Sequence, residues 1–291
     1  MRIRERKEGL RIAQLQTTVY DSKEKNREEI ARLFRLLFEE TKESGGMPDM
    51  VLLGEMCVCP YENAAFPRYA EKEKEETWNF FSLLAKEYGV YLSAGSVPEK
   101  DEEGRIYNTA YVFDRVGNQI AKHRKVHMFD IGIEGGQHFR ESDTLTPGDR
   151  FDVFDTEFGK MGICICFDAR FPEGIRLQVL NGAKVILCPA NFNMTTGPAH
   201  WELMFRGRAV DNQCYVIGTG VARDENGSYV AYGHSLVVSP WGEIVAEADE
   251  KPKIQITEID LETVDKVRAQ LPLLSARRED VYLLTQTERK S

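Results

Sequence analysis

The chain has 291 residues, of which 42% are hydrophobic and 29% charged, a composition typical of a globular protein. Its net charge of −9 argues against nucleic acid as a partner, because nucleic-acid binding needs clustered positive charge. The sequence contains no apolar run approaching the roughly 18–20 residues that span a bilayer, so no membrane partner is expected. The N-terminal segment MRIRERKEG lacks the apolar stretch of a secretory signal.

The six cysteines lie mostly in apolar, strand-like runs rather than in the loop-rich spacing of a disulfide framework. Two C-x-C pairs occur, at 57/59 and 164/166. Structural zinc sites instead use C-x₂₋₄-C spacing together with further Cys or His pairs. We therefore expect no metal site, and we expect reduced thiols, which favour a cytoplasmic location.

Apolar periodicity divides the chain into alternating strands and helices. Strands are predicted at 10–16, 50–54, 90–97, 109–113, 119–125, 151–155, 161–165, 184–188, 214–221, 234–239, 244–248 and 254–258. Helices are predicted from 21 or 22 to about 43, from about 71 to 88, from 172 to about 181, from 197 to about 212 and from 261 to about 269. The polar segment 127–149 is predicted as a long loop, and loops of this length are usually functional.

The early β-α-β units followed by hairpins predict mixed sheets, because crossovers join parallel strands and hairpins join antiparallel ones. Two such sheets packed face to face, with helices outside, would bury this many apolar strands. The sequence contains no linker, repeat or low-complexity segment. A single domain is therefore expected over residues 1–291, with its core at about 10–260 and a C-terminal tail at 261–291.

The segment KMGICICFDARFPE, residues 160–173, is typical of a strand that delivers a nucleophile to a tight turn before a helix. Cys166 ends the apolar run, polar residues follow at once, and Pro172 stands where a helix can begin. Spacing alone leaves the alternative that Cys166 is an ordinary buried strand cysteine. Cys164 is a competitor on the same strand face, but its earlier position places it deeper in the strand.

A cysteine nucleophile needs a base, and no histidine is obviously placed beside Cys166 in the sequence. Glu55 follows a buried strand, where partial desolvation would raise its pKa toward the range useful in general acid–base catalysis. Lys125, in KHRKVHMFD, could lower the pKa of the thiol and stabilise an oxyanion. The alternatives are a solvated strand-end Glu55, a solvated basic run around Lys125, and a loop salt bridge for Glu141.

Together, the acid after a buried strand, the lysine in KHRKVHMFDI and the cysteine in GICICFDARFPE resemble the nitrilase superfamily of carbon–nitrogen hydrolases. The resemblance runs from about Leu10 to Tyr282. Further stretches are similar to the omega-amidase branch of that superfamily: YNTAYVF, FDIGI, LTPGD, NMTTGPAHWELMFRGRAVDNQCYV, YGHSLVVSPWGEI and LPLLSARREDVY.

The resemblance implies an α/β fold, a four-layer α-β-β-α sandwich with two mixed sheets, and a catalytic triad of Glu55, Lys125 and Cys166. It also implies a second glutamate at Glu141 and an oxyanion site at the backbone N–H of Phe167. Homodimers or larger homo-oligomers that pair sandwiches through helices are expected. The resemblance implies neither a cofactor nor a metal ion.

The pocket walls are less well defined by the sequence. Arg170 lies four residues after Cys166, so its planar side chain could bind a substrate carboxylate bidentately. The alternative is a salt bridge at the start of the helix with Asp168 or Glu173. His200, in GPAHWE, is interpreted as a hydrogen-bonded structural histidine. The remaining residues expected to line the pocket are Tyr61, Phe192 and Thr195.

The chain departs from the family pattern around this pocket. Gly54 precedes the predicted base where proline is common, Cys164 replaces a small residue, and Asn191 stands where a small residue is more usual. The segment 134–139 differs from the turn expected there. These differences concern the identity of the substrate rather than the reaction.

We therefore predict an amidohydrolase that releases ammonia from the terminal amide of a small carboxylate-bearing substrate through a cysteine thioester. The expected substrate is 2-oxoglutaramate or 2-oxosuccinamate. The alternatives are a deaminated-glutathione amidase and a hydrolase of simple amides, N-carbamoyl compounds or nitriles. A catalytically silent binding protein with this fold would be expected to lack a triad member, and all three members are present.

Overall fold

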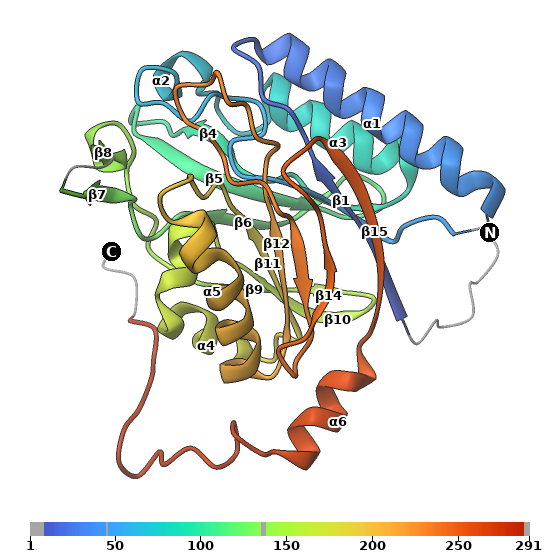
Figure 1. Ribbon diagram of the computed structural model, residues 1–291, viewed down its shortest axis with the longest axis vertical. Coiled ribbons are helices and arrows are strands. Elements are labelled where there is room, and N and C mark those ends of the chain that lie inside the picture. The colour runs from blue at the N-terminus through green and yellow to red at the C-terminus, as the bar shows by residue number, and fades with distance from the viewer. Residues whose placement is uncertain (1–8, 45, 135–137, 288–291) are drawn as a thin grey trace.

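Two β-sheets lie face to face at the centre of the molecule (Figure 1). The structure is a computed structural model that describes residues 9–44, 46–134 and 138–287. The first sheet has the order β15-β1-β2-β3-β5-β4, with β6 paired to β5. Within it β1, β2 and β3 are parallel, whereas the other pairs are antiparallel. Its strands are β1 (Gly9–Gln16), β2 (Met50–Leu53), β3 (Tyr91–Ser93), β4 (Val97–Lys100), β5 (Ile106–Phe113), β6 (Gln119–Arg124) and β15 (Lys253–Asp260).

The second sheet has the order β14-β13-β12-β11-β10-β9 and is also mixed. Strands β10, β11 and β12 are parallel, and antiparallel strands flank them on both sides. Its strands are β9 (Val153–Thr156), β10 (Gly159–Ile163), β11 (Val185–Pro189), β12 (Tyr215–Thr219), β13 (Leu236–Val238) and β14 (Ile244–Glu247).

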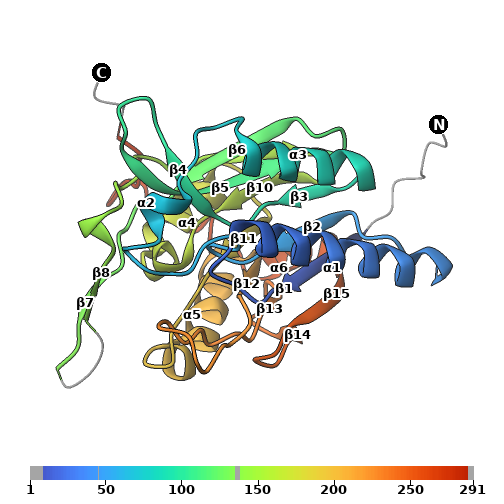
Figure 2. The ribbon, with the colours of Figure 1, turned by 90° about the horizontal axis from the view of Figure 1, so that it is seen from above.

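Helices cover the outer faces of both sheets, so the predicted α-β-β-α order is confirmed (Figures 1 and 2). Helices α1 and α3 pack on the first sheet, whereas α4 and α5 pack on the second. The helices are α1 (Lys23–Ser44), α2 (Phe66–Tyr69), α3 (Glu76–Tyr88), α4 (Pro172–Leu180), α5 (Gly197–Asn212) and α6 (Glu262–Gln270). Across the described ranges, none of these helices combines the length and the apolar character needed to cross a bilayer.

The alternation of side chains along the strands explains the layering. In β1, Leu10 and Ile12 belong to the apolar cluster between the two sheets, whereas Leu15 belongs to the cluster under α1 and α3. In β2, Leu52 faces the opposite sheet and Leu53 faces the helices. Both faces of these strands are buried, which is why their sequences are continuously apolar.

The predicted strand 90–97 is divided into β3 and β4. The break occurs at Gly95, which has φ of +57°, and a side chain there would collide with the carbonyl oxygen of Gly54. Because glycine alone tolerates both conditions, the chain after β2 can lie directly against this break. The N–H of Ser96 accordingly donates to the Gly54 carbonyl oxygen at 3.4 Å. This close approach fixes the backbone next to Glu55.

The predicted loop 127–149 contains regular structure that polar composition concealed. Its described parts form a hairpin, β7 (Asp130–Gly132) with β8 (His138–Arg140), and a short 3₁₀ helix, η1 (Glu141–Asp143). Residues 135–137, which belong to the unusual 134–139 segment, lie outside the described residues. The 3₁₀ turn places Glu141 in the protein interior.

Candidate active site

Three chain segments that each follow a strand bring the predicted triad together. Glu55 follows β2, Lys125 follows β6, and Cys166 follows β10. Glu55 and Lys125 therefore come from the first sheet, and Cys166 comes from the second. Glu55 and Lys125 have no exposed surface and Cys166 is only 4% exposed. Buried charged residues of this kind are rare unless they are paired, so the pairing partners define the site.

Lys125 lies between two carboxylates. Its Nζ is 3.0 Å from Glu55 Oε1 and 2.9 Å from Glu141 Oε2, and it also donates to the hydroxyl oxygen of Tyr61 at 3.1 Å. The side-chain amide of Asn108 donates to Oε1 of Glu55 at 2.8 Å and to Oε1 of Glu141 at 3.2 Å. The spacing of single residues gave no signal for Asn108, although it lies in the YNTAYVF motif.

The basic run that contains Lys125 is divided between two environments. Lys122 and Arg124 both bind the Glu99 carboxylate, at 2.5 Å and 2.7 Å. His123 and Lys125 point to the opposite side of the strand and are buried. Strand alternation therefore separates a charged outer row from an inner row, and Lys125 is not part of a solvated basic patch.

Glu141 is fixed from the loop side. Its Oε2 accepts the backbone N–H of Phe129 at 2.7 Å, and its own N–H donates to the Phe129 carbonyl oxygen at 3.2 Å. The side chain is fully buried, in contrast to the alternative of an exposed loop salt bridge. Glu141 therefore holds the Lys125 ammonium in a set direction.

Burial and charge together set the protonation states of the cluster. Burial raises the pKa of Glu55, and the Lys125 ammonium offsets only part of that rise. Burial would lower the pKa of Lys125, but the charges of Glu141 and Glu55 outweigh it and raise the pKa. Burial and the Glu55 charge raise the pKa of the Cys166 thiol well above its ordinary value. The thiol is therefore protonated at neutral pH, and it needs a base.

Glu55 is placed to be that base. The Cys166 thiol and the Glu55 carboxylate lie close enough that each shifts the pKa of the other. The second carboxylate oxygen, Oε2, accepts the backbone N–H of Asn191 at 2.8 Å. A carboxylate with a raised pKa, held against the thiol by fixed donors, suits proton transfer in both directions.

Cys166 occupies a strained turn. Its φ of +46° lies in the left-handed region, which non-glycine residues rarely adopt. The residue begins a 3₁₀ helix, η2 (Cys166–Arg170), and α4 starts at Pro172 as predicted. The strand itself ends at Ile163, so both Cys164 and Cys166 lie beyond β10. Cys164 is fully buried beside Cys188 and contributes to the raised pKa of the Cys188 thiol.

Asp168 ties this turn to the lysine segment. Its buried carboxylate accepts three backbone N–H groups, those of Ile165 at 3.1 Å, Val126 at 3.1 Å and His127 at 2.9 Å. It also binds two imidazole nitrogens, His127 Nδ1 at 2.8 Å and His123 Nε2 at 2.9 Å. Burial would raise the pKa of Asp168, but the hydrogen bonds from His123 and His127 hold it well below its usual range. Because Val126 follows Lys125 directly, Asp168 couples the position of the lysine to that of the cysteine.

Asp168→Asn is expected to lower kcat roughly 10- to 100-fold with a smaller change in KM, because the lysine and the cysteine lose their common anchor. The measurement is steady-state kinetics on the purified variant, with the melting temperature recorded alongside. Asp152→Asn is the control, since that side chain is 54% exposed and pairs only at the surface with Arg150. A larger KM with unchanged kcat would contradict the positioning role.

The Arg170 guanidinium lies close to Cys166. Among the described contacts it forms no ion pair with Asp168 or Glu173, the two acids considered as its partners in the sequence analysis. Its Nη1 is 3.2 Å from Nδ1 of His200, and its charge lies 5.0 Å from the ring centre of Phe192. Asp168 is occupied by the histidines instead. Burial lowers the pKa of Arg170, although the Cys166 thiol acts in the opposite direction. A partly buried cation of this kind is a candidate anion site.

The other predicted pocket residues lie at different distances from the cluster. The Tyr61 hydroxyl donates to Glu141 Oε1 at 3.1 Å, and its ring packs against Tyr229 with centres 4.7 Å apart. Phe192 is buried against Trp201 and beneath Arg170. Thr195 is exposed, and its N–H donates to Asn193 Oδ1 at 3.1 Å. Among the described contacts, Thr195 is not brought to the catalytic cluster, whereas Tyr61 is part of it.

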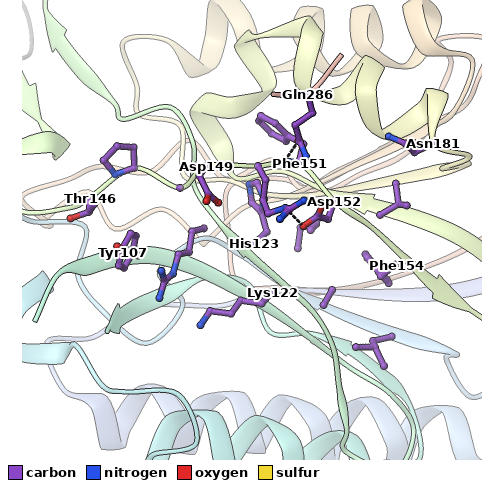
Figure 3. A pocket seen from close by; sticks show the side chains of 18 of the residues that line it. Tyr107, Lys122, His123, Thr146, Asp149, Phe151, Asp152, Phe154, Asn181 and Gln286 are labelled. Atoms are coloured by element: carbon purple, nitrogen blue, oxygen red, sulfur yellow. Dashed lines mark hydrogen bonds and ion pairs between the residues drawn. The ribbon is translucent and has the colours of Figure 1, made fainter. Parts of the chain in front are cut away.

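A cavity of about 920 Å³ lies between the edge strands β6 and β9, apart from the triad (Figure 3). Its lining includes Lys122, His123 and Phe151, but not Glu55, Lys125 or Cys166. The C-terminal tail reaches this cavity, where Gln286 Oε1 accepts the Phe151 N–H at 2.7 Å. The cavity lies at the edge of the sandwich. One of its lining residues, His123, connects it to the active site, because His123 Nε2 binds the Asp168 carboxylate.

The described ranges contain no group of three or more His, Cys, Asp or Glu side chains arranged to hold a metal ion. Most polar side chains around Cys166 instead pair with one another or with backbone groups, whereas Oδ1 of Asn108 and Oδ1 of Asn191 have no hydrogen-bond partner among the described residues. The arrangement is compatible with the predicted cysteine nucleophile, carboxylate base and buried lysine.

Comparison with known proteins agrees with this geometry. The model of the carbon–nitrogen hydrolase family matches residues 10–269. The omega-amidase NIT2-A of Xenopus laevis is 48% identical over 246 residues, which cover 84% of this chain and 88% of that protein. The omega-amidase NIT2 of Bos taurus is 44% identical over 272 residues, which cover 94% and 96%.

Solved structures give the same result. Nit3 of Saccharomyces cerevisiae, a member of the nitrilase superfamily, superposes with a TM-score of 0.84 at 37% identity, covering 93% of this chain and 97% of that chain. The C. elegans NitFhit protein superposes with a TM-score of 0.86 at 33% identity, covering 97% and 68%. The chain therefore belongs to the carbon–nitrogen hydrolase family, as its motifs predicted. It is an amidohydrolase enzyme.

Proposed function

We propose that this enzyme is an omega-amidase, which hydrolyses the terminal amide of 2-oxoglutaramate or 2-oxosuccinamate. The contact of Cys166 with Glu55, beside a lysine held by two carboxylates, carries the proposal. Relatives named omega-amidase, at 43–48% identity over most of the chain, support the substrate class. Arg170, close to the thiol, supplies a cation for the free carboxylate of such a substrate.

In the first half-reaction, Glu55 takes the proton of the Cys166 thiol, and the sulfur attacks the amide carbonyl carbon. A carbon–sulfur bond forms and the carbonyl π electrons move onto oxygen. The Lys125 ammonium and the N–H of Phe167 stabilise this oxyanion, at roughly 3–4 kcal/mol for each donor. Glu55 then passes its proton to the departing nitrogen, the carbon–nitrogen bond breaks, and ammonia leaves a thioester on Cys166.

In the second half-reaction, Glu55 removes a proton from water, and the hydroxide attacks the thioester carbon. The same oxyanion donors act again. The carbon–sulfur bond breaks, the sulfur regains a proton from Glu55, and the dicarboxylic acid leaves. Glu141 keeps the ammonium of Lys125 in place throughout and transfers no proton in this scheme.

The assay is ammonia release from 2-oxoglutaramate, compared with deaminated glutathione, a simple neutral amide, an N-carbamoyl compound and a nitrile. The 2-oxo acid monoamide is expected to have the highest kcat/KM. Higher turnover of any other compound in the panel would reassign the substrate while keeping the reaction.

Arg170→Ala is expected to lower kcat/KM for the carboxylate-bearing amide by about 10- to 100-fold and to spare the neutral amide, because only the former loses a charge-assisted contact. Both substrates are measured on the same preparation. Arg176→Ala is the matched control, since Arg176 is also partly buried but binds the Asp211 carbonyl oxygen on the α4–α5 side. Equal losses on the two substrates would exclude the carboxylate contact.

We further propose a cytoplasmic homodimer built from one hydrolase domain per chain, with a core at about 10–260. Pairing of β1 with β15 joins the first and last strands and supports one domain. Exposed apolar side chains on α5, Leu203 at 70% and Val210 at 43%, support helix pairing between copies. All six cysteines are free thiols, which supports a reducing compartment.

A further inference from the structure

Asn191 lies inside the catalytic cluster but has no role in the scheme above. It follows β11, and it is 6% exposed. Its backbone N–H donates to Glu55 Oε2 at 2.8 Å, and its carbonyl oxygen accepts the Tyr229 hydroxyl at 2.5 Å. Both backbone groups of residue 191 are therefore fixed, one of them directly on the base.

The side chain of Asn191 contains a hydrogen-bond acceptor that is not satisfied. Its Oδ1 is buried and has no hydrogen-bond partner among the described residues. An enclosed acceptor without a donor is unfavourable, and native proteins usually supply one. Position 191 is also one of the places where the sequence analysis expects a departure from the family pattern.

A bound substrate can supply the missing donor. Glu55 passes its proton to the departing nitrogen, and the N–H of residue 191 touches that same carboxylate. In the proposed mechanism the departing nitrogen is therefore expected beside residue 191, on the side of the base. A primary amide carries two N–H donors at this nitrogen, whereas an ester or a nitrile carries none.

We propose that Asn191 is a specificity-determining residue whose Oδ1 accepts a hydrogen bond from the N–H of the scissile carboxamide. The contact strengthens as the reaction proceeds, because the nitrogen becomes more positive when it receives the proton from Glu55. It selects primary amides over substrates without an N–H at that position, since those would leave Oδ1 buried and unpaired. This inference rests on the proposed amidase function.

The test compares 2-oxoglutaramate with its terminal methyl ester, which releases the same acid through the same thioester. The variants are Asn191→Leu, which keeps the shape of the side chain, and Asn191→Ala. In both, the amide-to-ester ratio of kcat/KM is expected to fall by about 10-fold or more, because only the amide loses a contact. The ratio is independent of the fraction of active protein, since the same preparation hydrolyses both substrates.

Asn212→Ala is the matched control, because Asn212 is also buried with an unpartnered Oδ1 but lies at the end of α5. Its ratio should equal that of the unaltered enzyme. An unchanged ratio in either Asn191 variant would overturn the inference, and so would a folded variant that hydrolyses neither substrate. If the unaltered enzyme releases no ammonia from any amide, the proposed function itself fails, which is a separate result.

Discussion

Cys166→Ala is expected to abolish ammonia release, with a loss of at least about 1,000-fold in kcat, because no thioester can form without the sulfur. The variant should fold, since alanine fills most of the same space and the position is buried. Ammonia production from 2-oxoglutaramate is the measurement. An acyl adduct on Cys166, trapped by rapid acid quench and located by peptide mass spectrometry in the unaltered enzyme, is the positive counterpart.

Cys164→Ala is the control for this result. Cys164 is equally buried, yet its sulfur contacts the Cys188 thiol rather than Glu55. Its loss removes a packing contact and leaves the base and the nucleophile in place, so most of the activity should remain. Full activity of the Cys166→Ala protein, or inactivity confined to the Cys164→Ala protein, would exchange the two assignments.

Lys125→Met is expected to lower the free energy of unfolding by about 3–5 kcal/mol near neutral pH and to abolish activity. Methionine keeps the length of the side chain but removes the ammonium that lies between Glu55 and Glu141. Two buried carboxylates then face each other without a cation. Denaturant unfolding of the variant and of the unaltered protein measures the difference.

The stability deficit of Lys125→Met should shrink as the pH falls. The pKa of Glu55 is already raised above 4.5 by burial, and removal of the Lys125 charge raises it further. A carboxyl whose pKa is raised in the folded state binds a proton on folding, so its stabilising effect is present below the unfolded pKa and is lost as pH rises through the folded value. The deficit is therefore largest near pH 8 and smallest near pH 5.

Lys122→Met, on the same strand, is the comparison for Lys125→Met. Lys122 binds Glu73 and Glu99 but is partly exposed, so its loss should lower the free energy of unfolding by no more than about 1 kcal/mol. A Lys125→Met deficit as small as this, or one that grows toward acid pH, would contradict the buried three-charge arrangement.

The layer order and the convergence of Glu55, Lys125 and Cys166 could be predicted from the sequence for a common physical reason. Each of Glu55, Lys125 and Cys166 follows a strand, and strand ends are where a sandwich can hold polar groups next to a buried core. The family motifs then joined the three positions. Spacing alone could not distinguish Lys125 from its neighbours, because the sequence shows only a run of basic residues. In the structure, strand alternation buries every second residue of this run, His123 and Lys125.

The contacts that hold the site were not predictable in the same way. Asp168 meets Val126 and His127 across about 40 residues of sequence, and Asn191 meets Glu55 across 136. Such pairs form only when the two sheets pack against each other, so no local sequence pattern predicts them. Element ends were also imprecise: α3 begins at Glu76 rather than near 71, because the Glu71 carboxylate accepts the Thr77 N–H at 2.7 Å and binds Lys23.

The origin of the triad in two different sheets has a mechanical consequence. Glu55 and Cys166 are joined covalently only through the chain between β2 and β10, so apolar packing between the two sheets sets their spacing. Ile12 and Leu52 belong to that packed layer, whose thickness sets the distance that a proton would cross between Cys166 and Glu55 in the proposed mechanism. We therefore expect substitutions deep in the sandwich to change the turnover rate by altering this spacing, without changing the residues of the pocket.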